Sequence, residues 1–130
     1  GESPADGGRG VVLSGGHFLG ANEVRAMRSV PEMVFLNCCH LGAWRNEAVL
    51  AKADPTLLAA TIADELIELG VRCVVVTGWA VEDTPAAIFA RRLYQELLAG
   101  ARFVDAVSAA REACWSAAPA GKTWAAYQCY

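Results

Sequence analysis

Two cysteines and a histidine follow directly on a short apolar segment, and they are the residues of this chain best suited to chemistry. Residues 34–37 (VFLN) form the end of the segment, and Cys38, Cys39 and His40 come next. A short, nearly continuous apolar run is typical of a strand buried on both faces. Open α/β folds place their chemistry at the carboxyl ends of such strands. A cysteine at this point is therefore a candidate nucleophile.

The alternation of side chains along a strand separates these residues. Adjacent residues point to opposite faces, so Cys38 and Cys39 cannot both face one site. We expect Cys38 to face the core and His40 to have a surface or loop role, while the simple alternative for Cys39 is a small core residue. A redox pair is disfavoured because redox motifs leave two residues between their thiols. We expect His17, in a predicted hairpin, to be structural or exposed.

Composition and charge exclude several classes of protein. The 130 residues are sufficient for one domain, and 55% of them are hydrophobic while 19% are charged. This excess of apolar residues predicts packing against a partner, a second copy or another part of the same domain. The net charge of −3 argues against nucleic-acid binding, and no apolar run approaches the ~18 residues of a membrane span. An odd number of cysteines and the lack of a visible secretory signal predict a reduced, cytoplasmic protein.

The pattern of apolar residues predicts alternating strands and helices. The expected elements are a hairpin over 11–19, a short helix over 22–28, strands over 33–37 and 71–77, helices over 57–69, 84–98 and 104–117, and a last strand or extended segment over 123–130. Buried strands that alternate with helices predict an α/β fold with a mostly parallel sheet, helices on both faces and right-handed crossovers. Two long strands are too few for an independent sheet, so we expect the C-terminal part of a larger domain.

Four segments of the chain resemble the CHAT domain, a caspase-like family of the separase and caspase group. They are VFLNCCHLG (34–42), LLAATIADELIELGVRCVVVTGWAVED (57–83), AAIFARRLYQELLAGARFVDAVSAAREACW (86–115) and TWAAYQCY (123–130). With the hairpin and short helix at 11–28, the resemblance covers nearly the whole chain. It implies a caspase-like three-layer sandwich, with residues 1–130 forming the C-terminal portion of a single CHAT-like domain whose N-terminal part is missing from this chain.

The resemblance also implies a cysteine endopeptidase with a Cys–His dyad. Cys39 matches the family nucleophile, and the family histidine lies in a His-Gly motif that we expect just before Gly1. The base would then lie outside this sequence, and these residues alone would be inactive. In such a site the histidine takes the thiol proton, the thiolate forms an acyl-enzyme, and backbone amides stabilise the oxyanion.

The segment after the second predicted strand contains the candidate substrate-binding residues. In separase-like relatives an acidic residue here helps to hold a basic side chain of the substrate, and Asp83 matches it, with Glu82 as the alternate. A carboxylate favours Arg or Lys by charge pairing. The competing interpretation is that Asp83 or Thr84 caps the helix over 84–98. Trp79 forms either a pocket wall or part of the core.

A non-catalytic CHAT-like interaction or signalling module is the alternative function, favoured by the doubled cysteine and the base outside the chain.

We expect no cofactor and no metal site, because no CxxC or HxxxH spacing occurs. The expected partners are a protein or peptide substrate and fused domains such as helical repeats, within a bacterial-type regulatory or defence protein. Exposed sheet edges would favour self-association.

Overall fold

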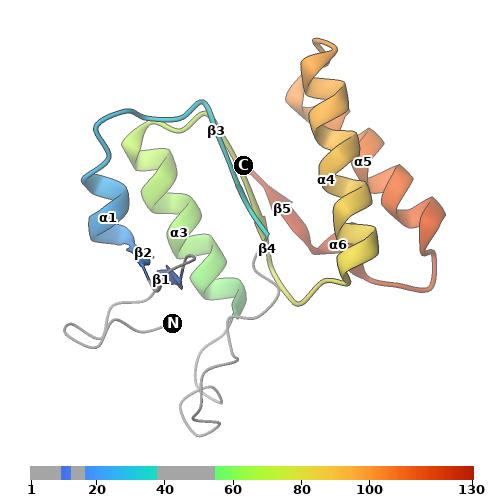
Figure 1. Cartoon of the computed structure of the whole chain (residues 1–130), viewed down its shortest axis with the longest axis horizontal. Coiled ribbons are helices and arrows are strands. Elements are labelled where there is room, and N and C mark those ends of the chain that lie inside the picture. Colours follow the sequence, from blue (N-terminus) through green and yellow to red (C-terminus); the bar gives the residue numbers. More distant parts are fainter. Residues whose placement is uncertain (1–9, 13–16, 38–54) are drawn as a thin grey trace, which may run out of the picture.

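Apart from one short helix near the C-terminus, the strands and helices follow one another in the order that the sequence predicts (Figure 1). The computed structural model describes residues 10–12, 17–37 and 55–130. Its elements are β1 (Gly10–Val12), β2 (Phe18–Gly20), α1 (Ala21–Arg25), β3 (Met33–Leu36), α3 (Pro55–Leu69), β4 (Cys73–Thr77), α4 (Asp83–Leu98), α5 (Phe103–Ala117), α6 (Thr123–Ala126) and β5 (Tyr127–Cys129). The hairpin expected near the N-terminus is confirmed by the antiparallel pairing of β1 with β2.

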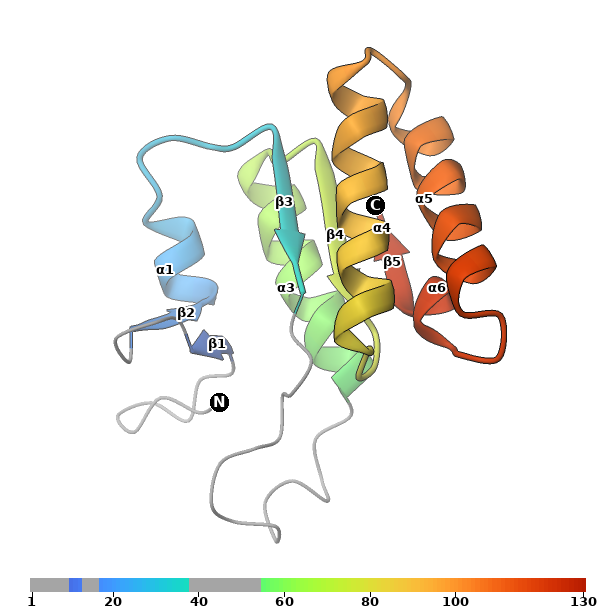
Figure 2. The ribbon, with the colours of Figure 1, turned by 45° about the vertical axis from the view of Figure 1, so that its right-hand side comes forward.

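The sheet that positions the candidate site has the strand order β3-β4-β5. β3 runs parallel to β4, with Leu36 opposite Val76, and β5 runs antiparallel to β4, with Tyr127 opposite Thr77. The expectation of a mostly parallel sheet is therefore wrong for the described residues, whose sheet is mixed. Among the described residues, α3 precedes β4 and runs back along the sheet, so that β4 lies parallel to β3. The two long helices α4 and α5 lie between β4 and β5, and they return the chain so that β5 runs antiparallel (Figure 2).

Strand β4 contributes to two hydrophobic cores because its side chains alternate between the faces of the sheet. Val74 and Val76 pack with residues of α1 and α3, whereas Val75 packs with residues of α4 and α5. In Figure 1, α1 and α3 lie to the left of the sheet, and α4 and α5 lie to its right. Almost no surface of these three valines reaches solvent, which explains the uninterrupted apolar run in the sequence.

Helices α4 and α5 pack closely because α5 presents small side chains to its partner. The buried positions of α5 are Ala106, Val107, Ala110 and Cys114, while α4 buries Phe89 and Leu93 one turn apart. Small residues on one helix allow the backbones to approach and leave space for the large side chains of the other. This second core therefore depends on two large residues of α4.

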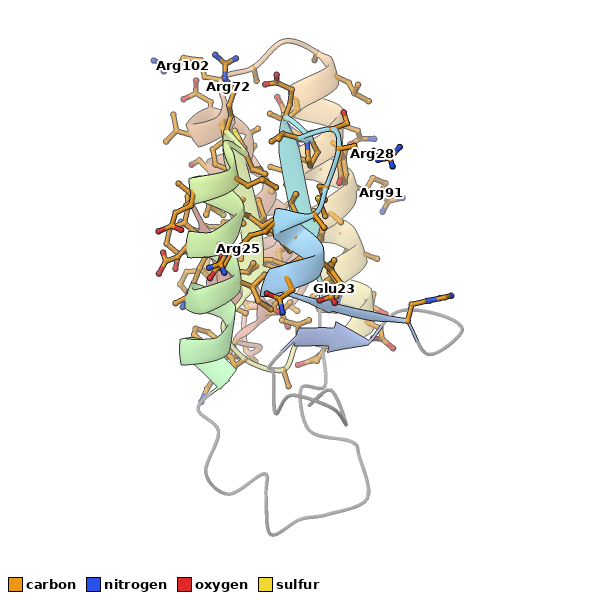
Figure 3. All side chains as sticks on the ribbon, turned by 90° about the vertical axis from the view of Figure 1, so that its left-hand side faces the viewer. Glu23, Arg25, Arg28, Arg72, Arg91 and Arg102 are labelled. Atoms are coloured by element: carbon orange, nitrogen blue, oxygen red, sulfur yellow. The ribbon has the colours of Figure 1, made fainter. Side chains whose placement is uncertain are left out.

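Helix α1 packs against α3, on the opposite side of the sheet from α4 and α5, through polar and apolar contacts. Arg25 of α1 forms an ion pair with Glu65 of α3, with 2.6 Å between Arg25 Nη2 and Glu65 Oε1 (Figure 3). Val24, on the same turn, is buried in the core with Leu66. Helix α1 ends at Arg25, three residues before the expected end. No helix among the described residues is both long enough and apolar enough to cross a membrane.

Candidate active site at the carboxyl ends of β3 and β4

The strand that leads to the candidate nucleophile ends beside the strand that leads to the candidate substrate pocket. β3 and β4 are parallel neighbours whose last paired residues are Leu36 and Val76. Asn37 and Thr77 therefore occupy the same edge of the sheet. Cys38, Cys39 and His40 follow Asn37 in the sequence and lie outside the described residues. We predicted that the segment leading to Cys39 and the segment after β4 lie at the same edge of the sheet. The pairing of β3 with β4 agrees with this prediction up to Asn37, the last described residue before Cys39.

A hydrogen bond from the C-terminal strand fixes the end of β3. The Tyr127 hydroxyl, on β5, donates to Asn37 Oδ1 over 3.2 Å. β4 lies between β3 and β5, so this side chain spans the central strand. The bond joins residues 90 positions apart in the sequence and ends two residues before Cys39.

The ring of Tyr127 is held rigidly in the second core. Its ring stacks on Phe89, with centroids 3.8 Å apart and planes within 11°, and lies 5.7 Å from the ring of Phe35. Tyr127 is 1% exposed, and its carbonyl oxygen accepts a hydrogen bond from Arg111 Nη2 over 2.8 Å. The position of Arg111 on α5 thus brings its guanidinium to a backbone acceptor at the start of β5.

The segment after β4 makes a close backbone contact with the end of α6. The Gly78 amide donates to the Ala126 carbonyl over 2.9 Å. A Cβ atom added at Gly78 would lie 2.8 Å from Gln128 Nε2, which is below the usual contact distance. A larger residue at Gly78 would therefore require the side chain of Gln128 to shift.

Trp79, Glu82 and Asp83 lie in and after this segment. Trp79 is 42% exposed, so its side chain is not part of the core and remains available to a ligand. Glu82 is the N-cap residue of α4, and its side chain makes no capping hydrogen bond. Asp83 is the first residue of the helix and is exposed, so the expectation that Asp83 or Thr84 occupies the N-cap is wrong. A carboxylate in the first turn still interacts favourably with the helix dipole.

The two carboxylates have different surroundings. The Glu82 amide donates to Thr123 Oγ1 over 3.2 Å, and a Cβ atom added at Gly121 would lie 3.5 Å from Glu82 Oε1. Glu82 is thus directed toward the turn between α5 and α6. Both Glu82 and Asp83 are exposed at the start of α4, so the two carboxylates differ in direction rather than in exposure.

A comparison of the sequence with models of protein families identifies the family of this chain. The sequence model of the CHAT domain matches residues 3–130. The chain belongs to the CHAT domain family. The match spans the predicted nucleophile Cys39, the pocket residues after β4 and the closing TWAAY segment. No curated protein and no solved structure matches the chain.

Two cysteines of the CHAT domain are in surroundings that disfavour the thiolate. Burial raises the pKa of the Cys114 thiol, and the Glu82 carboxylate raises that pKa further. Burial also raises the pKa of Cys129, although the Arg111 guanidinium acts in the opposite direction. A raised pKa leaves less thiolate, the reactive form, at neutral pH.

We therefore expect Cys114 and Cys129 to react with iodoacetamide more slowly than free cysteine at neutral pH, with both rates rising as the pH increases. Mass spectrometry of the labelled peptides measures each rate separately. Rates equal to that of free cysteine in the folded CHAT domain would contradict the burial of these thiols.

The CHAT domain also contains polar contacts that sequence patterns did not reveal. The hydrogen bonds of Asn37 with Tyr127 and of Glu82 with Thr123 hold the two segments of the candidate site, and both bonds join residues far apart in the sequence. The one sequence feature that could have indicated these contacts is the TWAAY segment (123–127). This segment is part of the resemblance to the CHAT domain, but its residues show neither helical nor strand periodicity. Among the described residues, no group of three or more His, Cys, Asp and Glu side chains is placed to hold a metal ion.

Proposed function

We propose that this CHAT domain is a caspase-like cysteine endopeptidase in which Cys39 is the nucleophile. The CHAT domain is a caspase-like, peptidase-related family, and membership of it supports the proposal. The observation that supports it most is the parallel pairing of β3 with β4, because β3 leads along the sequence to Cys39 and β4 leads to Trp79 and Asp83. The three-layer sandwich of the caspase-like fold, and residues 1–130 as the C-terminal portion of one such domain, belong to the same proposal.

The proposed reaction needs a histidine base, and the resemblance to the family implies that this base belongs to a His-Gly segment. That histidine takes the thiol proton of Cys39, and the thiolate attacks the scissile carbonyl. The amine product leaves with the proton from the histidine, and water then hydrolyses the thioester. Backbone amides at the end of β3 stabilise the oxyanion in both steps.

Asp83 supplies the proposed preference for substrates with a basic residue before the cleaved bond. It is exposed at the start of α4, and Trp79 is exposed in the preceding segment. A carboxylate pairs with the charge of an Arg or Lys side chain, while an indole ring covers its aliphatic part. Glu82 has a smaller role in this scheme because it is directed toward the α5–α6 turn.

Cleavage of matched peptides by the full-length protein tests the proposed function. The peptides differ only in carrying Arg, Lys, Gln or Glu at one position, and mass spectrometry identifies the cleaved bond. We expect cleavage after Arg and Lys that depends on Cys39. Intact peptides after prolonged incubation, together with slow labelling of Cys39, would oppose the proposal.

The charge of Asp83 can be tested separately from its size. We expect Asp83→Asn to lower kcat/KM for the Arg peptide by about tenfold or more, because a hydrogen bond to a charged group contributes about 1.5–3 kcal/mol. The Gln peptide should lose much less. Steady-state kinetics on both peptides measure the difference.

Asp64 provides the matched control for this change, because it is also exposed on a helix, on the other side of the sheet. Asp64→Asn should leave both peptides unaffected. An equal loss on the Arg and Gln peptides in Asp83→Asn would mean that Asp83 supports the fold rather than recognises charge.

A non-catalytic interaction or signalling module is the second candidate. It is favoured by exposed aromatic side chains, including Trp115 at 51% and Trp79 at 42%. The outer strands of the described sheet, β3 and β5, are also sites for strand pairing and self-association. Uniformly slow thiol labelling of the full-length protein would favour the module. A molar mass from light scattering equal to that of one chain would count against self-association.

A further inference from the structure

We infer that residues 123–127 (TWAAY), here named the closing segment, position both halves of the active site. Tyr127 holds the end of β3 that leads to Cys39, and Thr123 holds the start of α4 that carries Asp83. Both are positioning residues, since each acts through another residue. The inference rests on the proposed function, because it assigns separate kinetic roles to the two contacts.

The Tyr127 contact has the rigidity that positioning requires. The ring cannot move freely, because it is 1% exposed and stacked on Phe89. The backbone of Tyr127 is fixed by pairing with Thr77 and by the hydrogen bond from Arg111. The hydroxyl therefore presents a fixed donor to Asn37 Oδ1. This partly buried hydrogen bond between side chains restrains Asn37, two residues before Cys39 in the sequence.

The Thr123 contact holds the other half of the site in the same way. Thr123 is 4% exposed, and its hydroxyl oxygen accepts the hydrogen bond from the Glu82 amide. A third contact, from the Gly78 amide to the Ala126 carbonyl, holds the start of the same segment. Residues 78–82 are thus tied to the closing segment at both ends. Asp83 follows directly, on a helix whose direction is set by its packing on α5.

The two hydroxyls reach different halves of the site, so their loss should affect different kinetic constants. Removing the Tyr127 hydroxyl disturbs the approach to the nucleophile and should lower kcat. Removing the Thr123 hydroxyl disturbs the approach to the basic-residue pocket and should raise KM for Arg peptides. A closing segment that served only the stability of the fold would change both constants together or neither.

The test compares Tyr127→Phe and Thr123→Val in the full-length protein on the Arg and Gln peptides. Tyr127→Phe keeps the ring stacked on Phe89, and Thr123→Val keeps the shape of the side chain. Tyr130→Phe is the matched control, because it removes an exposed hydroxyl that donates only to nearby Gln128. Thr123→Ser is the conservative variant, which retains the hydroxyl and should restore KM. Thermal unfolding of every variant separates kinetic effects from loss of folded protein.

We expect Tyr127→Phe to lower kcat by about two- to tenfold and Thr123→Val to raise KM for the Arg peptide by a similar factor, since the net contribution of one hydrogen bond is about 0.5–1.5 kcal/mol. We also expect Tyr127→Phe to slow alkylation of Cys39 and to change its pH profile, while Tyr130→Phe leaves both unchanged. Equal kcat, KM and alkylation rates in the wild type and both variants would overturn the inference. So would equal changes in both constants.

The alkylation rate separates this inference from the proposed function. If the wild type shows no cleavage that depends on Cys39, the peptidase proposal fails. A slower alkylation of Cys39 in Tyr127→Phe would still support positioning by the closing segment. An unchanged rate and pH profile in that variant would overturn the positioning role of Tyr127, whether or not the wild type cleaves peptides.

Discussion

Replacing Cys39 with alanine in the full-length protein should lower kcat/KM for the Arg peptide by at least about a thousandfold. The nucleophile is part of a dyad that acts as a unit, so its removal leaves only binding and oxyanion stabilisation. Steady-state kinetics measure the loss, and mass spectrometry should show the acyl-enzyme in the wild type only. Binding of the intact peptide should persist, because Asp83 and Trp79 are unchanged.

Cys38 offers a matched control, since it carries the same side chain one residue earlier. Cys38→Ala should retain most of the activity, because adjacent residues of an extended segment face opposite ways. Cys73→Ala, within β4, controls for the general loss of a thiol. If Cys38→Ala lost the activity and Cys39→Ala kept it, the nucleophile would be the neighbouring cysteine.

The largest effect on stability should come from Phe89. This side chain is fully buried in the core between α4, α5 and the sheet, where it stacks on Tyr127 and lies 6.4 Å from the ring of Phe35. Phe89→Ala removes these contacts and leaves a cavity, so we expect the free energy of unfolding to fall by about 3–5 kcal/mol. Urea unfolding followed by circular dichroism measures the change.

Tyr94 is the matched control on the same helix. Its ring also faces Phe35, at 6.0 Å between centroids, but the residue is 43% exposed. Tyr94→Ala should therefore cost about 1 kcal/mol, the usual effect of a residue outside the core. Equal losses for the two variants would mean that the aromatic contacts, and not the burial of Phe89, determine the stability of this core.

The main elements of the fold were predictable because the buried faces of strands and helices require apolar residues at characteristic spacings in the sequence. The β-branched run of β4 and the helical spacing of Phe89 and Leu93 each indicate the correct element. The short helix α6 was not predicted, because four residues are too few to show helical periodicity. The antiparallel direction of β5 was also missed, since it follows from the return of the chain through α4 and α5 rather than from the residues of β5.

Less of the candidate site was predictable. The shared sheet edge follows from two buried strands and the rule for parallel strands, so the placement of Trp79 and Asp83 after β4 was correct. The bond from Tyr127 to Asn37 could not be predicted, because nothing in local sequence indicates a contact between residues 90 positions apart. The N-cap was misplaced by one or two residues, because the helix already begins at Asp83, and the N-cap Glu82 makes no side-chain capping bond that a sequence pattern could indicate. Cys39 itself stays a prediction, outside the described residues.

The position of Thr123–Tyr127 along the chain has a consequence for biosynthesis. The ribosome makes these residues after β3, β4 and α4, the three elements that they connect. Domains fold as units during synthesis, so a nascent chain that already carries Cys39 and Asp83 still lacks the hydrogen bonds to Asn37 and Glu82. Under the proposed function, a nascent chain would therefore gain peptidase activity only after residue 127 had been synthesised and had packed beside β4.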